Sequence, residues 1–140
     1  MFMVVVLWLS RHPPLKVQLE TLKAKLGNVE LKIYDKPLGT VEEATKLVEQ
    51  YKAKYVVPVL PLSFIARLVE ESKKKDFVVL WAEMELLHNC KEGVKCKDYD
   101  PNQDSIVKTK DMQTGEEFFR HYRFRGFKIL KAIKFETEEF

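Results

Sequence analysis

The sequence predicts an α/β fold in which a chain of 140 residues forms a mainly parallel sheet with helices packed against it. Over residues 1–87, short apolar runs alternate with stretches whose apolar residues recur at helical spacing, in the order β-α-β-α-β-α-β. The first run, VVVLWL at residues 4–9, is apolar and rich in β-branched residues, which is typical of a strand buried on both faces. The length suits a single domain with one core.

The elements of this core can be placed from local signals. Strands are expected at residues 4–9, 29–34, 55–60 and 77–82. The first helix carries leucines at helical spacing with Gln18 on its solvent side, and it ends before Gly27. The second helix begins after Thr40, because Thr40 and Glu43 have the spacing of a capping box. A third helix begins beside Ser63 and ends in a run of lysines, which suits the helix dipole.

Pro58 bears on the strand order. It lies inside the third expected strand and has no N–H to donate, which favours an edge position and therefore the order 3-2-1-4. The alternative order, 2-1-3-4, would place this strand inside the sheet. The alternation of elements resembles that of Rossmann-like and flavodoxin-like three-layer domains, a likeness that does not by itself assign a function.

The pattern changes after the core. Residues 88–117 are polar and lack sustained periodicity, so we expect a long polar loop, more mobile than the sheet. Apolar residues return at residues 118–140, where we expect a pair of strands at 118–124 and 127–136 with a bend or bulge at Gly126. The second of these segments also fits a helical period.

Composition places the chain among soluble globular proteins, with 46% hydrophobic and 32% charged residues. No apolar run reaches the roughly 18 residues that a membrane span needs, and signal-peptide features are missing, so we expect a cytoplasmic protein. The bias toward Lys and Glu resembles that of thermophile proteins, although a mesophile with a Lys-rich surface fits as well. A net charge of +3 does not by itself indicate nucleic acid.

Two loop motifs resemble metal sites without matching one. His88, Cys90 and Cys96 lack the second close pair of ligands that structural zinc uses, so free thiols or a disulfide are favoured over a metal. Residues 98–104 alternate oxygen ligands as a calcium loop does, but the glycine and the closing glutamate of such a loop are missing.

The first candidate site follows the first strand. Ser10, Arg11 and His12 emerge where open α/β sheets bind ligands, and Ser63, beside the start of the third helix, is a further candidate ligand-binding residue. Arginine can bind a phosphate or carboxylate, and histidine can act as a general acid or base. The alternative is an ordinary solvated loop. Because the glycine patterns of dinucleotide sites and P-loops are missing, we expect no dinucleotide cofactor and assign no other.

A second candidate site is acidic. Glu83 and Glu85 end the fourth strand, and with Asp35 they could bind Mg²⁺ or act as general bases. The alternative, which we favour, is a charged strand end of the common kind.

The third candidate is a basic surface on the C-terminal strands. Six basic and no acidic residues lie between Phe118 and Phe135, interleaved with aromatic residues. On a strand, Arg123 and Arg125 share one face with His121. This pattern suits phosphate backbones and stacked bases, but it also fits a half-buried sheet with a basic outer face.

These patterns lead to one principal hypothesis and two alternatives. The first is a small protein that binds an anionic ligand, either a nucleotide or a nucleic acid, through Ser10, Arg11, Ser63, Arg123 and Arg125. The second is a metal-dependent hydrolase or nuclease that uses His12 with Glu83 or Asp35. The third is a non-catalytic homodimer in which the C-terminal strands pair with a second copy.

Overall fold

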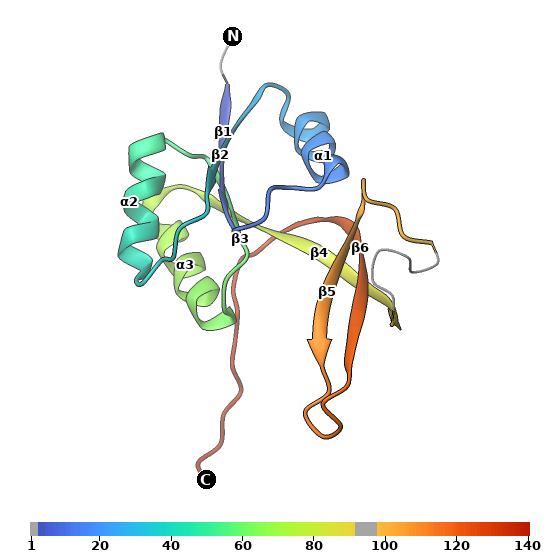
Figure 1. Ribbon diagram of the computed structural model, residues 1–140. Coiled ribbons are helices and arrows are strands. Elements are labelled where there is room, and N and C mark those ends of the chain that lie inside the picture. The colour runs from blue at the N-terminus through green and yellow to red at the C-terminus, as the bar shows by residue number, and fades with distance from the viewer. Residues whose placement is uncertain (1–2, 92–97) are drawn as a thin grey trace.

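A computed structural model describes residues 3–91 and 98–140 and shows a mixed α/β fold over them (Figure 1). The strands are β1 (Val4–Leu9), β2 (Val29–Tyr34), β3 (Tyr55–Pro58), β4 (Val78–Cys90), β5 (Asp104–Lys110) and β6 (Glu117–Ile129). The helices are α1 (Lys16–Leu26), α2 (Val41–Tyr51) and α3 (Leu62–Lys75). All of the elements expected over the first 87 residues are therefore present.

The strands form one sheet in the order β2-β1-β3-β4-β6-β5. Neighbouring strands among β2, β1, β3 and β4 are parallel, whereas β6 is antiparallel to both β4 and β5. The prediction of a mainly parallel sheet is therefore wrong for its C-terminal part, and the sheet is mixed. The short turn at residues 111–116 accounts for the antiparallel pairing of β5 with β6, because so short a connection joins antiparallel strands.

The favoured strand order is also wrong. The parallel strands run 2-1-3-4, with β3 between β1 and β4. Pro58 is the last residue of β3, paired with Leu9, and the ladder continues through the N–H of Val59, which donates to the carbonyl of Leu9 at 2.9 Å. A proline at the end of a strand removes few of the hydrogen bonds between strands, so it does not require a position at the edge of the sheet.

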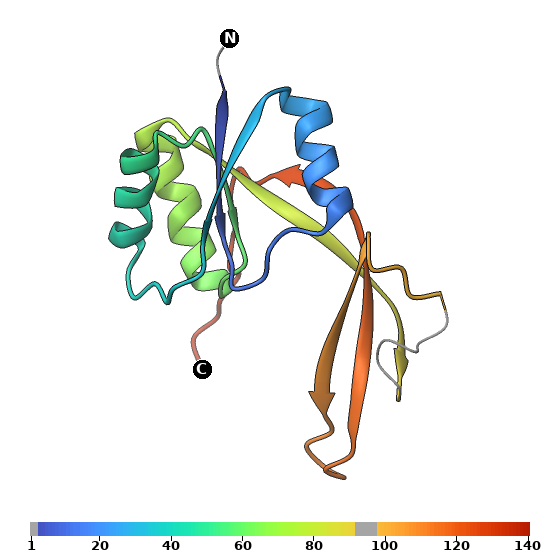
Figure 2. The same ribbon diagram turned by 45° about the horizontal axis from the view of Figure 1, so that its top comes forward.

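The helices cover both faces of the parallel strands (Figure 2). On one face, α2 and α3 pack over a cluster that includes Leu7, Leu9 and Val56. On the other face, Leu22 of α1 packs against a cluster that includes Val6 and Trp8. A strand covered on both faces is expected to bury Val5, Leu7, Leu9, Val57, Val79 and Trp81; Leu7, Leu9, Val57 and Val79 are buried, while Val5 and Trp81 are half-buried.

The C-terminal third is more regular than expected. The predicted polar loop contains all of β5 and the end of β4, and β6 is a single strand that ends at Ile129. The predicted bulge is confirmed, since the register shifts between Glu83 and Met84 opposite Gly126, whose φ is 130°. We call β5, residues 117–125 of β6 and residues 84–90 of β4 the arm, which projects away from the helices in Figure 2.

Two local predictions for the helices have opposite outcomes. The hydroxyl of Thr40 accepts from the N–H of Glu43 at 3.3 Å, which confirms the predicted start of α2. Gln18 was expected in solvent, but it is only 5% exposed. The first turn of α1 packs against the chain near the arm, where the N–H of Val17 donates to the carbonyl of Asn102 at 3.0 Å.

The loop motif of His88, Cys90 and Cys96 lies partly outside the described residues, because Cys96 falls among residues 92–97. Cys90 is disulfide-bonded, one of the two states favoured from the sequence. None of the helices in the described ranges combines the length and the apolar character that a membrane crossing requires.

Candidate functional site

The unequal lengths of the parallel strands open a gap at their carboxyl ends. β3 pairs with β4 as far as Val56 and Val79, and then β3 ends at Pro58 while β4 continues to Cys90. β1 also stops here, at Leu9. The chain leaves β1 toward α1 on one face and leaves β3 toward α3 on the other. In open α/β sheets such a switch point is the usual place for a ligand.

One cavity at this edge is largely apolar, and we call it the apolar cavity. Its volume is about 360 Å³, within the range of small-molecule sites. Both tryptophans of the chain, Trp8 and Trp81, line it, and Ala82 and Met84 extend its wall along β4. The remaining lining residues are Ser10, His12, Pro13, Leu15, Gln18, Pro58, Val59, Leu60, Ile65 and Ser105.

A second cavity, of about 350 Å³, adjoins the first, and we call it the polar cavity. Arg11, Lys36 and Asp35 line it, and all three are exposed. The two cavities share four lining residues, namely Ser10, His12, Val59 and Leu60. The two cavities are therefore adjacent at the ends of β1 and β3.

Two hydrogen bonds shape the loop between the cavities. The indole N–H of Trp8 donates to the carbonyl of His12 at 2.9 Å. The backbone N–H of His12 donates to the hydroxyl of Ser10 at 3.1 Å. These bonds fix the backbone of the loop, and the hydroxyl of Ser10 keeps its own proton to donate.

The structure brings together one group of the predicted site residues. Ser10, Arg11, His12 and Asp35 all line the polar cavity, although they come from the ends of two different strands. Ser63 is exposed in the first turn of α3 and lines neither cavity.

The other predicted residues lie elsewhere, on the strands that extend into the arm. Glu83 faces Lys128, with 3.9 Å between the carboxylate and the ammonium group. Glu85 accepts from Nε of Arg125 at 2.8 Å. The expected acidic cluster of Glu83, Glu85 and Asp35 does not form around a cavity, because both glutamates are paired with cations of β6 while Asp35 lines the polar cavity.

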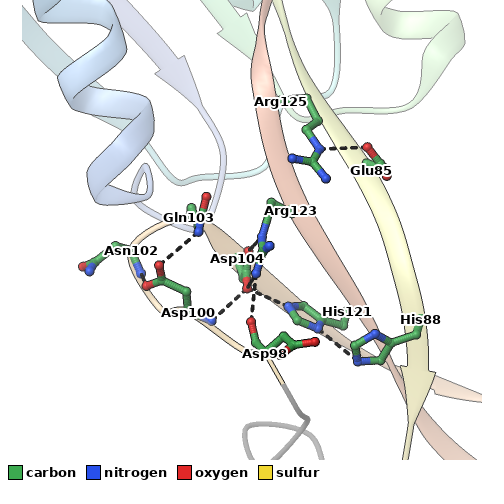
Figure 3. Close-up of polar contacts among 10 residues, drawn as sticks. All are labelled: Glu85, His88, Asp98, Asp100, Asn102, Gln103, Asp104, His121, Arg123 and Arg125. Carbon is green, nitrogen blue, oxygen red and sulfur yellow. Dashed lines mark hydrogen bonds and ion pairs between the residues drawn. The ribbon is translucent and has the colours of Figure 1, made fainter.

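A buried polar cluster at the base of the arm, which we call the Asp104 cluster, lies beside this site (Figure 3). Asp104 is 1% exposed, and its carboxylate accepts from Nε2 of His121 at 2.7 Å and from Nε of Arg123 at 2.8 Å. The backbone N–H of Asp100 donates to the same carboxylate at 2.8 Å. His121 is fully buried, and its Nδ1 lies 3.3 Å from Nε2 of His88.

The charges of this cluster stabilise one another. Burial alone raises the pKa of Asp104, but hydrogen bonds from Arg123, His121 and the backbone of Asp100 outweigh it and hold the pKa well below its ordinary value of 3.8. The hydrogen bond to Asp104 in turn raises the pKa of Arg123. The carboxylate is therefore ionised at neutral pH, and the guanidinium beside it is largely committed to an internal contact.

The Asp104 cluster positions one wall of the apolar cavity. Ser105, the residue after Asp104, lines that cavity. The carbonyls of Gln103 and Asn102 accept from the N–H groups of Phe124 and Val17, at 2.9 Å and 3.0 Å. The loop before β5 is thus tied both to β6 and to the first turn of α1. We assign the cluster a positioning role in the site.

Several residues of the site could not be identified from the sequence. The helical spacing puts Gln18 on the solvent side of its helix, because an amide on a surface helix gives no sign of a neighbouring arm. The sequence offers Asp104 only as part of a calcium-like loop. The residues Ile106, Val107 and Thr109 carried a signal for a strand, since β-branched residues favour strands, and a strand there would have placed Asp104 near Arg123.

Two further findings concern possible ligands and relatives. Among the residues that the structure describes, no group of three or more His, Cys, Asp and Glu side chains is arranged to hold a metal ion. No protein-family model, curated protein or solved structure matches the chain. The function is therefore inferred from the geometry of the site itself.

Proposed function

We propose that the protein binds a small phosphate-bearing ligand at the carboxyl ends of β1 and β3, with the phosphate in the polar cavity. The observation that carries the proposal is the convergence of Arg11, Lys36 and His12 on this cavity at the switch point of the sheet. Arginine binds phosphate through paired hydrogen bonds, and lysine adds a second positive charge.

Arg11 and Lys36 differ from the arginines of the arm in their ion pairing. Within residues 3–91 and 98–140, neither Arg11 nor Lys36 forms an ion pair with a carboxylate. Arg123 and Arg125 are held instead by Asp104 and Glu85, each at 2.8 Å. An incoming phosphate would have to compete with these carboxylates on the arm. The free cations of the polar cavity therefore favour a small ligand there over a nucleic acid on the basic strands.

The remaining polar groups suit a phosphate ester as well. The hydroxyl of Ser10 can donate to a phosphate oxygen, and the imidazole of His12 can do the same when protonated. Asp35 opposes a bare anion, but its carboxylate can accept from a hydroxyl group of the ligand. A sugar phosphate has both kinds of group.

The proposal can be tested by titrating the protein with ribose 5-phosphate in a calorimeter. Arg11→Ala should weaken binding by roughly 10- to 100-fold, because a hydrogen bond between charged groups is lost. Arg67→Ala is the matched control, since Arg67 is an exposed arginine of α3 whose partner, Glu42, lies outside both cavities. The control should bind as the wild type does.

Binding should also weaken as salt is added, because screening reduces attraction between exposed charges. Two results would overturn the proposal. One is that the wild type does not bind ribose 5-phosphate even at low salt. The other is that Arg11→Ala binds it as tightly as Arg67→Ala does.

Phosphate ester hydrolysis is a second candidate function, supported by the presence of His12 and Asp35 in the same cavity. A histidine and a carboxylate can act as general acid and base, and a carboxylate can also help to hold a divalent metal. Release of phosphate from a monoester in the presence of Mg²⁺ would support it if Asp35→Asn abolished turnover while ribose 5-phosphate still bound. If the wild type releases no phosphate, this second candidate is rejected.

A further inference from the structure

We infer that the ligand is a mononucleotide, whose base enters the apolar cavity while its phosphate lies in the polar cavity. This inference rests on the proposed function, because it adds a base subsite to the phosphate subsite. It commits to a ligand with an aromatic ring at one end and a phosphate at the other. The base subsite is argued from the apolar cavity, whereas the phosphate subsite is that of the proposed function.

The first observation is that the two cavities are adjacent. Ser10, His12, Val59 and Leu60 line both of them, so both lie beside the loop after β1 and the end of β3. One cavity is lined mainly by apolar and aromatic groups, and the other carries the charges. A ligand that fills both must therefore be apolar at one end and charged at the other. A sugar is a suitable connection, because Ser10 and His12 offer polar groups at the junction.

The second observation is the position of the tryptophans. Trp8 of β1 and Trp81 of β4 lie on either side of β3 and pack with the clusters on opposite faces of the sheet, and both line the apolar cavity at the end of β3. The indole N–H of Trp8 is already bonded to the carbonyl of His12, which fixes the orientation of its ring. Aromatic side chains with a fixed orientation suit stacking against a planar base.

The third observation is Gln18, a buried amide that lines the apolar cavity. Its Oε1 accepts from the N–H of Leu15 at 2.8 Å, whereas its Nε2 faces the sulfur of Met84 at 3.8 Å. A thioether is a weak acceptor, and an amide nitrogen carries two protons. The side chain therefore keeps a donor for a better acceptor in the cavity. A ring nitrogen or carbonyl of a base supplies one, and a hydrocarbon ring does not.

The chain offers a direct reporter for this subsite. Trp8 and Trp81 are its two tryptophans, so all tryptophan emission comes from residues that line the apolar cavity. The experiment titrates the full chain with AMP, adenosine and ribose 5-phosphate, following emission and, in parallel, heat. AMP should change the emission saturably and bind about tenfold or more tighter than ribose 5-phosphate, because stacking adds to the phosphate contacts. Ribose 5-phosphate should bind without changing the emission.

Variants separate the two subsites. Ala82→Leu enlarges a side chain in the wall of the apolar cavity and should reduce AMP affinity to that of ribose 5-phosphate, whose own affinity should not change. Ala24→Leu is the matched control, because Ala24 is exposed on α1 and lines neither cavity. Gln18→Leu keeps the side-chain volume similar but removes the amide, so it also should weaken the binding of AMP. The binding of ribose 5-phosphate should not change. If Ala82→Leu fails to fold, Gln18→Leu alone tests whether the base binds in the apolar cavity.

The outcomes distinguish the two proposals. If ribose 5-phosphate binds through Arg11 but AMP binds no tighter and leaves the emission unchanged, the base subsite is rejected and the phosphate site stands. If AMP binds tighter but both cavity variants bind it as the Ala24→Leu control does, the base lies elsewhere and the inference is again rejected. If neither compound binds, both proposals are rejected together.

Discussion

Replacing Asp104 with asparagine should destabilise the protein strongly. The carboxylate accepts four hydrogen bonds, two from Arg123 and one each from His121 and the backbone of Asp100. In either orientation, the amide group of asparagine would place its own N–H protons against at least one of these donors. Because the variant also removes a buried charge from its partners, it should lose about 3–5 kcal/mol of unfolding free energy. That is a large part of the roughly 5–15 kcal/mol typical of a domain.

The effect should depend on pH in a direction set by the pKa of Asp104. The folded state holds this pKa well below 3.8, so folding favours the ionised carboxylate. The stabilisation is therefore fully present above 3.8 and is lost as the pH falls toward the pKa of the folded state. The difference in stability between wild type and Asp104→Asn should be largest near neutral pH and should narrow as the pH falls below 3.8.

Urea unfolding followed by circular dichroism at a series of pH values measures this difference. Asp98→Asn is the matched control, because Asp98 lies in the same loop but is exposed, and it should change stability by less than about 0.5 kcal/mol. Equal stability of Asp104→Asn and Asp98→Asn at neutral pH would contradict the stabilising role of the Asp104 carboxylate. A difference in stability between them that does not narrow in acid would contradict it as well.

Two further predictions concern the core and the arm. Leu7→Ala should cost about 2–5 kcal/mol in the same unfolding experiment, because Leu7 is fully buried between helices and sheet, and a loss below about 1 kcal/mol would contradict the assignment of β1 as a central strand. Arg125→Ala should leave the affinity for ribose 5-phosphate within about twofold of wild type at any salt concentration, since exposed ion pairs contribute little and Arg125 lies outside both cavities. A larger loss would show that the arm takes part in binding the phosphate.

The parallel half of the fold could be predicted from the sequence because its signals are local. The apolar run of residues 4–9 and the capping residues of α2 each define an element without reference to the rest of the chain. The predicted bounds of β1 and β2 agree with the structure for the same reason. Strand order is not a local property. Pro58 indicated an edge only on the assumption that it lay inside its strand.

The arm could not be predicted to the same extent, because its stability depends on partners distant in sequence. Asp104 is buried in a region that is polar throughout, and it is stabilised there by Arg123 and His121 of another strand. The hydropathy of β5 alone therefore suggested a loop. The candidate site was predicted in part, since Arg11, His12 and Asp35 follow strands whose ends meet. Gln18 enters it through packing between the first turn of α1 and Met84 of the arm, and Trp81 through its position on β4 beside the end of β3.

A crystal structure of the protein soaked with AMP tests the central claim most directly. We predict density for one molecule at the carboxyl ends of β1 and β3, with the phosphate beside Arg11 and Lys36 and the base in the apolar cavity. Density for AMP on the outer face of β6, or at another surface while this edge of the sheet remains empty, would contradict the account.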